Sequence, residues 1–329
     1  MFNNSSILIT GGTGSLGQSL VNYFVKNFPK IKRLVIFSRD EYKQFLMQEK
    51  FDEKKNPFLR YFVGDIRDYD RLKMALVGID YVIHAAALKQ VPTAEYNPFE
   101  FIQTNIIGSQ NIVRASLENN VKKVVALSTD KACSPVNLYG ATKLCSDKLF
   151  VSSNNLVGEK ETSFSVVRYG NVFASRGSII PFFLEKKKNK ETIPLTHESM
   201  TRFNISMSEA IETIIWSFKN CIGREIVVPK LKSFNVVDLI KIIDSSAKVK
   251  IIGVRPGEKI HEELISQSDS RTSIEYKDYY LILPEMKFFE KYSSYKNLKE
   301  NFSYKSSNAE SKMSLSELQI LIKKFENEN

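Results

Sequence analysis

The chain has 329 residues, of which 43% are hydrophobic and 26% are charged, and this composition is typical of a globular protein rather than of a disordered one. No apolar run approaches the roughly 20 residues that a membrane span requires, and the N-terminus lacks the basic region and cleavage site of a signal peptide, so we expect a cytoplasmic protein with no membrane partner. The formal net charge is +10, but no recognition-helix or RNA-binding signature accompanies it, so we expect a small anionic substrate and no nucleic acid.

Cysteine usage bears on metal binding and redox chemistry. Cys133, Cys145 and Cys221 are odd in number, and none of them has the spacing of a metal-ligand motif. We therefore expect no metal site and reduced thiols that pack as small hydrophobic side chains.

Short apolar segments alternate with amphipathic ones along most of the chain. Their lengths and composition predict strands at residues 6–10, 33–37, 60–65, 80–87, 122–129, 163–172 and 224–229. Leu16, Leu20 and Phe24 recur at helical spacing after the first strand, and a further helix is predicted at 104–119. Apolar strands that alternate with helices indicate a parallel sheet covered on both faces, so the predicted fold class is α/β, with a doubly wound parallel-sheet Rossmann domain.

The regular alternation ends near residue 175. The later segments are shorter and interrupted by proline and glycine, with one helix predicted at 235–244 and another after a capping box formed by Ser314 and Glu317. We predict that residues 1–174 form the Rossmann domain, with a return segment near 201–232. Residues 175–329 would then form mainly a smaller mixed α/β substrate-binding domain.

A glycine-rich segment, TGGTGSLG at residues 10–17, follows the first strand and opens the first helix. Gly11 permits a tight turn, Gly14 lets the backbone approach a pyrophosphate, and Gly17 permits close packing of helix on strand. The helix N-terminus presents free N–H groups and the positive end of its dipole to the phosphates, so this context predicts a dinucleotide-binding loop. The other residues assigned to the loop are Thr13, Ser15 and Leu16.

The end of the second predicted strand bears on the choice between NAD and NADP. An acidic residue there would bind the ribose hydroxyl of NAD and repel a phosphate. Instead, the strand ends with Ser38 and Arg39, and the acid comes later, at Asp40. A serine hydroxyl and a planar guanidinium suit a 2′-phosphate, so we predict NADP as the cofactor, although Arg39 alone would also fit as an ordinary surface residue.

Two further strand ends supply residues that would face the dinucleotide. Asp65, followed by Ile66, closes the third strand, where a carboxylate is placed to accept a hydrogen bond from the adenine amine. Ala85 and Ala86, near the end of the fourth predicted strand, are small residues that let the backbone pass close to the cofactor. His84, just before them, is interpreted as a packing residue.

Tyr139 and Lys143 are four residues apart, so on a helix they lie on one face. A tyrosine with a pKa of about 10 is a poor base at neutral pH, and we expect a nearby ammonium and the positive nicotinamide ring to lower that pKa. With Thr129 at the end of the fifth strand, these residues resemble the Ser/Thr–Tyr–Lys arrangement of the short-chain dehydrogenase/reductase superfamily, and the TGxxGxxG spacing resembles its extended branch. The resemblance implies that Lys143 also holds the cofactor ribose.

The adjacent Asp130 and Lys131, in STDKA, go beyond what hydride transfer requires and resemble the acid–base pair of the inverting UDP-N-acetylglucosamine 4,6-dehydratases. The segments that carry this resemblance are FSRDEYKQ, HAAALKQVPTAEYNP, STDKACSPVNLYGATKLCSDKLF, VVRYGNVFASRGSIIPFF, MTRF and GVRPGEKIHE. They are similar to the branch that begins pseudaminic acid synthesis for flagellin glycosylation. Capsule-sugar dehydratases share several of them, but many have a methionine in place of Tyr139.

The resemblance implies a role for each residue of this group. Tyr139 takes the proton of the C4 hydroxyl while a hydride passes to NADP⁺, and the hydride later returns to C6. Asp130 protonates the departing C6 hydroxyl, and Lys131 removes the C5 proton, which returns on the opposite face. Lys131 must be partly neutral for this, and we expect burial near Lys143 to lower its pKa. Taken alone, the Asp130–Lys131 pair would also fit a surface ion pair.

The diphosphate of UDP-N-acetylglucosamine, the expected substrate, requires cations, and arginine binds phosphate oxygens in pairs. The arginines in suitable segments are Arg176, Arg202 and Arg255. We expect Asn171 at the diphosphate or sugar, Glu258 at the uridine ribose hydroxyls and Lys89 near the sugar. Each of these residues would also fit as a turn or surface residue.

Other functions remain compatible with the sequence. One alternative is a retaining UDP-sugar 4,6-dehydratase, or a capsule-sugar dehydratase or epimerase, and a 4-epimerase would not require Asp130 and Lys131. An alternative of another class is a non-catalytic NADP-binding sensor, which typically lacks the Tyr or the Lys of the pair. Similar enzymes assemble into dimers or hexamers, so we expect a homo-oligomer.

Overall fold

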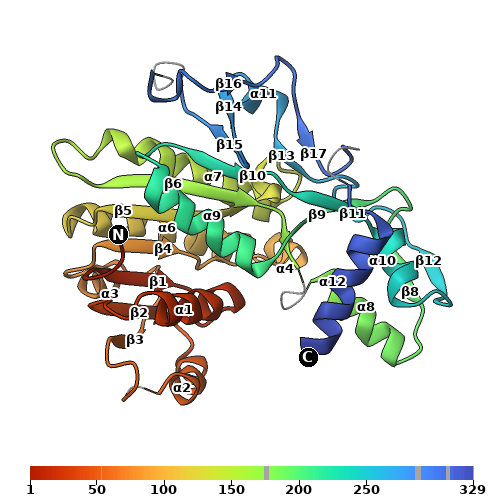
Figure 1. Ribbon diagram of the computed structural model, residues 1–329, viewed down its shortest axis with the longest axis horizontal. Coiled ribbons are helices and arrows are strands. Elements are labelled where there is room, and N and C mark those ends of the chain that lie inside the picture. Colours follow the sequence, from red (N-terminus) through yellow and green to blue (C-terminus); the bar gives the residue numbers. More distant parts are fainter. Residues whose placement is uncertain (53, 174–177, 286–289, 309–311, 329) are drawn as a thin grey trace.

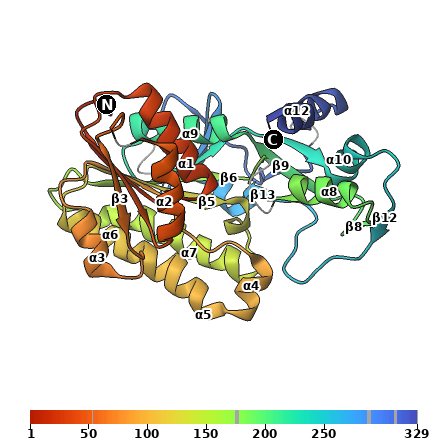
Figure 2. The ribbon, with the colours of Figure 1, turned by 90° about the horizontal axis from the view of Figure 1, so that it is seen from below.

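A ten-stranded sheet forms the centre of the computed structural model, and a smaller group of helices and strands lies at one end of it (Figure 1). The structure describes residues 1–328 except for residues 53, 174–177, 286–289 and 309–311. The sheet separates two layers of helices (Figure 2).

The parallel part of the sheet contains the apolar segments that the sequence predicts as strands. In sheet order its members are β3 (Leu59–Val63), β2 (Arg33–Ser38), β1 (Ser6–Thr10), β4 (Tyr81–His84), β5 (Lys123–Thr129), β6 (Ser163–Tyr169) and β10 (Ile226–Pro229). Ile7 of β1 pairs with Leu34 of β2 on one side and with Tyr81 of β4 on the other, so the strand order reverses at β1. This order confirms the predicted doubly wound α/β class, and ligands of such sheets bind at the carboxyl ends beside the reversal.

Helices cover both faces of this sheet (Figure 2). One face carries α1 (Ser15–Asn27) and α9 (Met207–Asn220), and the other carries α3 (Tyr69–Ala75), α6 (Gly108–Glu118) and α7 (Leu138–Ser152). The helix predicted at 104–119 begins as a π-helix, η1 (Ile102–Ile107), and continues as α6. The shorter helices of this part are α2 (Glu41–Lys50), α4 (Val91–Tyr96), α5 (Pro98–Phe101), η2 (Asp130–Ala132) and η3 (Ser153–Asn155).

The strand predicted at 163–172 is divided in the structure. Strand β6 ends at Tyr169, and β7 (Asn171–Val172) pairs with β9 (Thr201–Ile205) in a second sheet, whose third strand is β11 (Lys232–Asn235). Between them, a Cβ at Gly170 would lie 2.5 Å from the Cβ of Phe203 on β9. A residue without a side chain therefore lets the backbone pass closely from one sheet to the other.

The C-terminal part of the chain returns to the main sheet, which the sequence pattern did not predict. Strand β15 (Tyr279–Ile282) pairs antiparallel with β10, and β14 (Ser273–Tyr276) and β16 (Lys296–Asn297) follow outward. The ring of Tyr279 stacks on Trp216 of α9 with 4.4 Å between the centroids. These strands are too short and too rich in tyrosine to have the strict alternation by which a strand is recognised in a sequence.

A second hydrophobic core lies in the smaller group of elements. Its buried residues come mainly from α8 (Ile179–Lys188), β8 (Ile193–Leu195), α10 (Val236–Ile243) and α12 (Leu315–Glu328). Strand β12 (Val249–Ile251), whose residues are exposed, pairs with β8. The predicted helix at 235–244 is α10, and the capping box before α12 is confirmed by a 3.2 Å hydrogen bond from Glu317 N to Ser314 Oγ. The remaining elements are β13 (Glu263–Ile265), α11 (Gln267–Ser270) and β17 (Tyr304–Lys305). The division at residue 174 stays a prediction.

We predict that Gly17→Ala destabilises the protein more than Gly14→Ala does. A Cβ at Gly17 would lie 2.5 Å from the Cα of Gly12 and 2.6 Å from the carbonyl oxygen of Gly11, and these backbone atoms are fixed by β1 and α1. Overpacking of this kind costs about 1–3 kcal/mol. A Cβ at Gly14 would approach the Gly11 carbonyl oxygen at 3.2 Å, a milder contact. Urea unfolding followed by circular dichroism checks this, and equal midpoints for the two variants would contradict it.

Candidate active site

A cavity of about 930 Å³ opens at the carboxyl ends of β1, β4, β5 and β6 and extends to the second sheet. The predicted site residues that line it are Gly11, Gly14, Ser15, Leu16, Gly17, Ala85, Lys89, Thr129, Lys131, Tyr139, Lys143, Asn171, Arg202, Arg255 and Glu258. The predicted residues outside this lining are Thr13, Ser38, Arg39, Asp65, Ile66, Ala86 and Asp130, while Arg176 lies outside the described residues. Segments that are far apart in the sequence therefore meet at one cavity.

The glycine-rich loop packs closely against the backbone that follows β4. Gly11 has a φ of +66°, and a Cβ there would lie 2.9 Å from the Cα of Ala86. The backbone N–H groups of Ala85 and Ala86 donate to Thr10 Oγ1 at 3.1 and 3.2 Å, which fixes the end of β4 against β1. Gly14 caps α1 without a side chain, so the first N–H groups of the helix face an anion without competition from a capping side chain.

The residues predicted at the far end of the dinucleotide lie together at the ends of β2 and β3. The hydroxyls of Ser38 and Thr13 are 2.8 Å apart. The exposed Arg39 guanidinium is 3.7 Å from Asp65 Oδ2, and Arg67 Nη2 binds the same oxygen at 2.8 Å. Arg39 is therefore held only loosely by protein groups.

Asp40, the acidic residue that follows Arg39, stabilises the start of helix α2. It is the N-cap of α2, and its Oδ1 accepts a hydrogen bond from the backbone N–H of Lys43 at 3.0 Å. Its carboxylate also pairs with the Lys43 ammonium. Asp40 is thus committed to the start of a helix rather than to the end of the strand.

Strand β5, the short helix η2 and helix α7 together place the catalytic candidates. Thr129 ends β5, and Asn137 caps α7 by accepting from Gly140 N at 2.7 Å. A Cβ at Gly140 would overlap the carbonyl oxygen of Lys131, so α7 packs directly on η2. This contact brings Tyr139, on the first turn of α7, next to Lys131.

Tyr139 and Lys143 both lie on the buried side of α7 and line the cavity, as their spacing predicts. Lys143 Nζ donates to the carbonyl oxygen of Leu127 at 2.7 Å, and burial lowers its pKa against the opposing effect of Asp147. Burial raises the pKa of Tyr139 to about 12, although the charge of Lys131 and a hydrogen bond with Thr129 work in the other direction. The protein's own groups therefore keep this phenol protonated, while Lys131 acts in the direction expected of a nearby ammonium.

Lys131 lies between two buried carboxylates. Its Nζ is 2.8 Å from Asp130 Oδ1 and 3.3 Å from Glu262 Oε1, and it donates to Asn171 Oδ1 at 3.0 Å. Asp130 is fully buried and also accepts from Thr129 Oγ1 at 2.9 Å. Within the described part of the chain, Asp130 Oδ2 and Glu262 Oε2 are buried without a hydrogen-bond partner. The pair is thus no surface ion pair.

The expected lowering of the pKa of Lys131 is wrong for this arrangement. Burial does act to lower it, but the carboxylates of Asp130 and Glu262 outweigh burial, so the pKa of Lys131 lies above its ordinary value. Burial raises the pKa of Asp130, and the negative charge of Glu262 adds to this rise. The Asp130 carboxyl group, whose pKa is raised, is therefore in contact with the Lys131 ammonium.

Two substrate-binding candidates that were predicted separately are neighbours. Arg202 Nη2 lies 3.6 Å from Glu258 Oε1, and its Nη1 donates to the carbonyl oxygen of Ile260 at 3.0 Å. Glu258 also accepts from Thr196 Oγ1 at 3.1 Å. Both line the cavity together with Arg255, so one wall carries guanidinium groups and a carboxylate.

Glu262 is a cavity residue that sequence reasoning missed. It ends the segment GVRPGEKIHE, which had already supplied Arg255 and Glu258. Its approach to Lys131 depends on how the segment leading into β13 packs against η2, and no spacing in the sequence encodes that contact.

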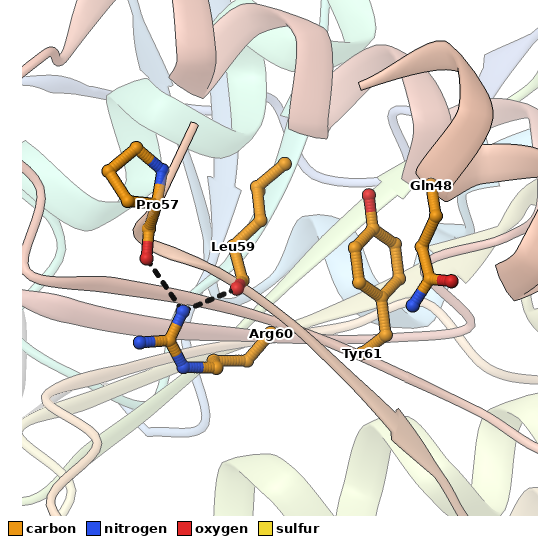
Figure 3. A pocket seen from close by; sticks show the side chains of 5 residues that line it. All are labelled: Gln48, Pro57, Leu59, Arg60 and Tyr61. Carbon is orange, nitrogen blue, oxygen red and sulfur yellow. Dashed lines mark hydrogen bonds between the residues drawn. The ribbon is translucent and has the colours of Figure 1, made fainter. Parts of the chain in front are cut away.

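A second cavity, of about 470 Å³, lies at β3 on the outer edge of the main sheet (Figure 3). Its lining residues are Gln48, Pro57, Leu59, Arg60 and Tyr61. Arg60 Nη1 donates to the carbonyl oxygens of Pro57 and Leu59, both at 2.7 Å, as the dashed lines in Figure 3 show. No predicted site residue lines this cavity, so we assign the chemistry to the larger one.

No helix in the described ranges is long and apolar enough to cross a membrane. Among the same residues, no three His, Cys, Asp or Glu side chains gather where they would hold a metal ion.

The sequence matches the family model described as polysaccharide biosynthesis protein over residues 7–284. It is 48% identical over 318 residues to an inverting UDP-N-acetylglucosamine 4,6-dehydratase of Campylobacter jejuni, with 94% of each chain covered. It is also 41% identical to a UDP-glucose 4-epimerase of Rickettsia massiliae, over 86% of this chain and 84% of that protein.

Solved structures show the same architecture. Pen from Bacillus thuringiensis superimposes with a TM-score of 0.91 over 99% of both chains, at 39% identity. DesIV, a dTDP-glucose 4,6-dehydratase of Streptomyces venezuelae whose structure contains NAD, has a TM-score of 0.69 over 78% of this chain and 86% of its own, and at 22% identity it shows a shared fold. The resemblance to inverting UDP-N-acetylglucosamine 4,6-dehydratases is therefore confirmed, and the chain belongs to the polysaccharide biosynthesis protein family.

Proposed function

We propose that the protein is an inverting UDP-N-acetylglucosamine 4,6-dehydratase, a carbon–oxygen lyase that uses NADP and forms a UDP-4-keto-6-deoxy-N-acetylhexosamine of the L-arabino series. The observation that carries the proposal is the buried 2.8 Å contact between Lys131 and Asp130, beside Tyr139 at the cavity. In the superfamily that the sequence resembles, a tyrosine and a lysine suffice for hydride transfer, whereas loss of water also requires an acid and a base. The name of the Campylobacter jejuni relative supports the same reaction.

The residues of the phosphate loop fit a dinucleotide. The N-terminus of α1, which Gly14 caps without a side chain, suits a pyrophosphate. The chemistry that NADP⁺ supplies when bound is the temporary storage of a hydride. We propose NADP rather than NAD because Ser38 ends β2 and Arg39 follows it, while Asp40 is committed to α2.

Tyr139 is the group that takes the proton of the C4 hydroxyl. Because burial raises its pKa to about 12, the proton leaves only when additional positive charge stabilises the phenolate. Lys131 supplies part of that charge, and the nicotinamide ring of the bound cofactor would add to it. Lys143, fixed to the Leu127 carbonyl, is placed to hold the cofactor ribose.

Asp130 and Lys131 become acid and base through one proton transfer. When the proton that lies between them moves from Lys131 to Asp130, the carboxylic acid and the neutral amine appear together. Asp130 then gives this proton to the departing C6 hydroxyl, which leaves as water, and Lys131 takes the proton from C5. The pair is back in its charged form afterwards, so no outside proton source is needed for the elimination.

The position in metabolism rests on the resemblance of the quoted segments. We place the reaction at the first step of pseudaminic acid synthesis for flagellin glycosylation, in the cytoplasm, and propose a homo-oligomer, either a dimer or a hexamer. The substrate-binding roles of Lys89, Asn171, Arg202 and Arg255 are part of the same proposal.

A UDP-sugar 4-epimerase is the second candidate, because the Rickettsia massiliae relative carries that name. An epimerase returns the hydride to C4 and keeps the C6 oxygen. Its chemistry leaves the buried Asp130–Lys131 pair without a task, and this is why we favour the dehydratase.

Proton NMR of the purified protein with UDP-N-acetylglucosamine and a trace of NADP⁺ in heavy water distinguishes these functions. We expect a 4-keto-6-deoxy sugar with deuterium at C5 and inverted configuration there. The same ketone with retained C5 would indicate a retaining dehydratase, and a 4-epimer with its C6 oxygen would indicate an epimerase. Tight NADP⁺ binding without turnover would favour a sensor.

We predict that Lys131→Ala lowers C5 deuterium incorporation by a factor of about 10²–10⁴, the usual contribution of a general base, while NADP⁺ binding persists. Lys122→Ala is the matched control, because Lys122 is exposed just before the other end of β5 and pairs with Asp80 at 2.9 Å. Isothermal titration with NADP⁺ verifies that each variant is folded. A Lys131→Ala enzyme with full exchange rate would remove this residue from the mechanism.

We predict that Arg39→Ala weakens NADP⁺ binding about 10- to 100-fold, since a hydrogen bond to a charged group contributes about 1.5–3 kcal/mol. NAD⁺ binding should change little, because NAD lacks the 2′-phosphate. Arg33→Ala, at the opposite end of β2, is the control and should bind both dinucleotides as the wild type does. Equal losses for both dinucleotides in Arg39→Ala would contradict the assignment of NADP.

A further inference from the structure

Glu262 is a buried carboxylate that the reaction described so far does not use. Its residue is 3% exposed, and its Oε1 lies 3.3 Å from Lys131 Nζ and 3.7 Å from Arg202 Nε. Its Oε2 is buried and, as far as the described residues show, without a hydrogen-bond partner. Burying a charged carboxylate costs free energy even when cations balance it, so its presence in the cavity wall requires an explanation.

The backbone of Glu262 is held firmly. Its N–H donates to Ser306 Oγ at 2.9 Å, and Ser306 N donates to the Glu262 carbonyl oxygen at 2.8 Å. The Ser306 hydroxyl is also 2.7 Å from Thr201 Oγ1, next to Arg202 on β9. The segment after β17 therefore fixes where the Glu262 side chain begins.

The contacts of Lys131 leave it no lone pair. Asp130, Asn171 and Glu262 offer acceptors at 2.8, 3.0 and 3.3 Å, and an ammonium has three N–H donors. To remove a proton from C5, Lys131 must first give one of its own to a neighbour. The Asn171 amide oxygen is a very weak base, so the choice is between the two carboxylates.

We propose that Glu262 is a positioning residue: it stays anionic, holds the Lys131 side chain in place when the amine becomes neutral, and so directs the departing proton to Asp130. This inference rests on the proposed dehydratase reaction. In the transfer one N–H bond of Lys131 breaks and one O–H bond forms on Asp130, while Glu262 gains and loses nothing.

The surrounding charges favour this division of tasks. Burial acts to raise the pKa of Glu262, but Lys131, Arg202 and Lys259 outweigh burial, so its pKa lies below the ordinary value. The pKa of Asp130 moves the other way, upward, because of burial and then of Glu262 itself. The charged and titratable groups that face the cluster are Asp130 and Lys131 on η2, Tyr139 on α7, Arg202 on β9, and Glu258 and Lys259 in the segment before Glu262.

The test is the pH dependence of C5 deuterium incorporation in Glu262→Gln, which removes the charge and keeps the shape. Without the neighbouring negative charge a proton is less stable on the Asp130–Lys131 pair, so both apparent pKa values of the pair fall. We expect both limbs of the profile to move to lower pH by about one unit or more. Limbs that stay in place would overturn the proposal even if the rate falls, because a purely structural role lowers the rate without moving the limbs.

Two further variants complete the experiment. Glu263→Gln removes the same charge one residue later, where the carboxylate contacts Ser134 at 2.7 Å and Lys305 at 3.7 Å, and it should keep the wild-type profile. Glu262→Asp keeps the charge but moves it away from Lys131. The limbs of its pH profile should therefore move to lower pH, but by less than those of Glu262→Gln. If thermal unfolding shows that Glu262→Gln is not folded, the Glu262→Asp profile decides, and unmoved limbs there overturn the proposal.

The wild-type assay separates the two possible failures. If the wild-type protein forms no 4-keto-6-deoxy sugar, the proposed function fails and the task of Glu262 fails with it. In the other case, the wild type forms that sugar while the pH profile of Glu262→Gln has its limbs at the wild-type pH values. The proposed dehydratase function is then retained, and only the proposed role of Glu262 is overturned.

Discussion

The contact between the Lys131 ammonium and the buried Asp130 carboxylate is the interaction on which the active site depends. Two opposite charges taken out of water lose their hydration, and they are tolerated only when every charge has a partner. Glu262 and Arg202 extend the pair into a row in which the signs alternate. Removing any member leaves another buried charge without compensation, so the chemistry and the stability of this region are bound together.

The fold supplies this row from separate elements. Asp130 and Lys131 follow β5, Arg202 belongs to β9, and Glu262 precedes β13. The division of the sixth predicted strand at Gly170 is what allows it, because β7 leaves the main sheet there and pairs with β9. The carboxyl ends of the parallel strands thus line one side of the cavity, while residues of the second sheet line another.

Sequence reasoning succeeded where chemistry is encoded locally. The phosphate loop, the Tyr139–Lys143 spacing and the capping box at Ser314 each depend on a few neighbouring residues, and the structure has all of these local arrangements. It failed where the outcome depends on distant packing. The raised pKa of Lys131 comes mainly from two carboxylates, and one of them, Glu262, is brought in by tertiary structure alone. Strands β14 to β16 were missed because they are short and lack a strict alternation, and only the pairing of β15 with β10 joins distant segments.

The antiparallel addition of β15 to β10 has a consequence for how the chain matures. During synthesis the N-terminal strands emerge first, and β6 presents an open edge until residue 229 has been made. Strand β10 then presents its own open edge until residue 282 follows. Unpaired edges of this kind recruit other chains. The last quarter of the protein therefore completes this side of the sheet late in synthesis. A nascent chain that stops before this part has been made exposes an unpaired strand edge to neighbouring nascent chains.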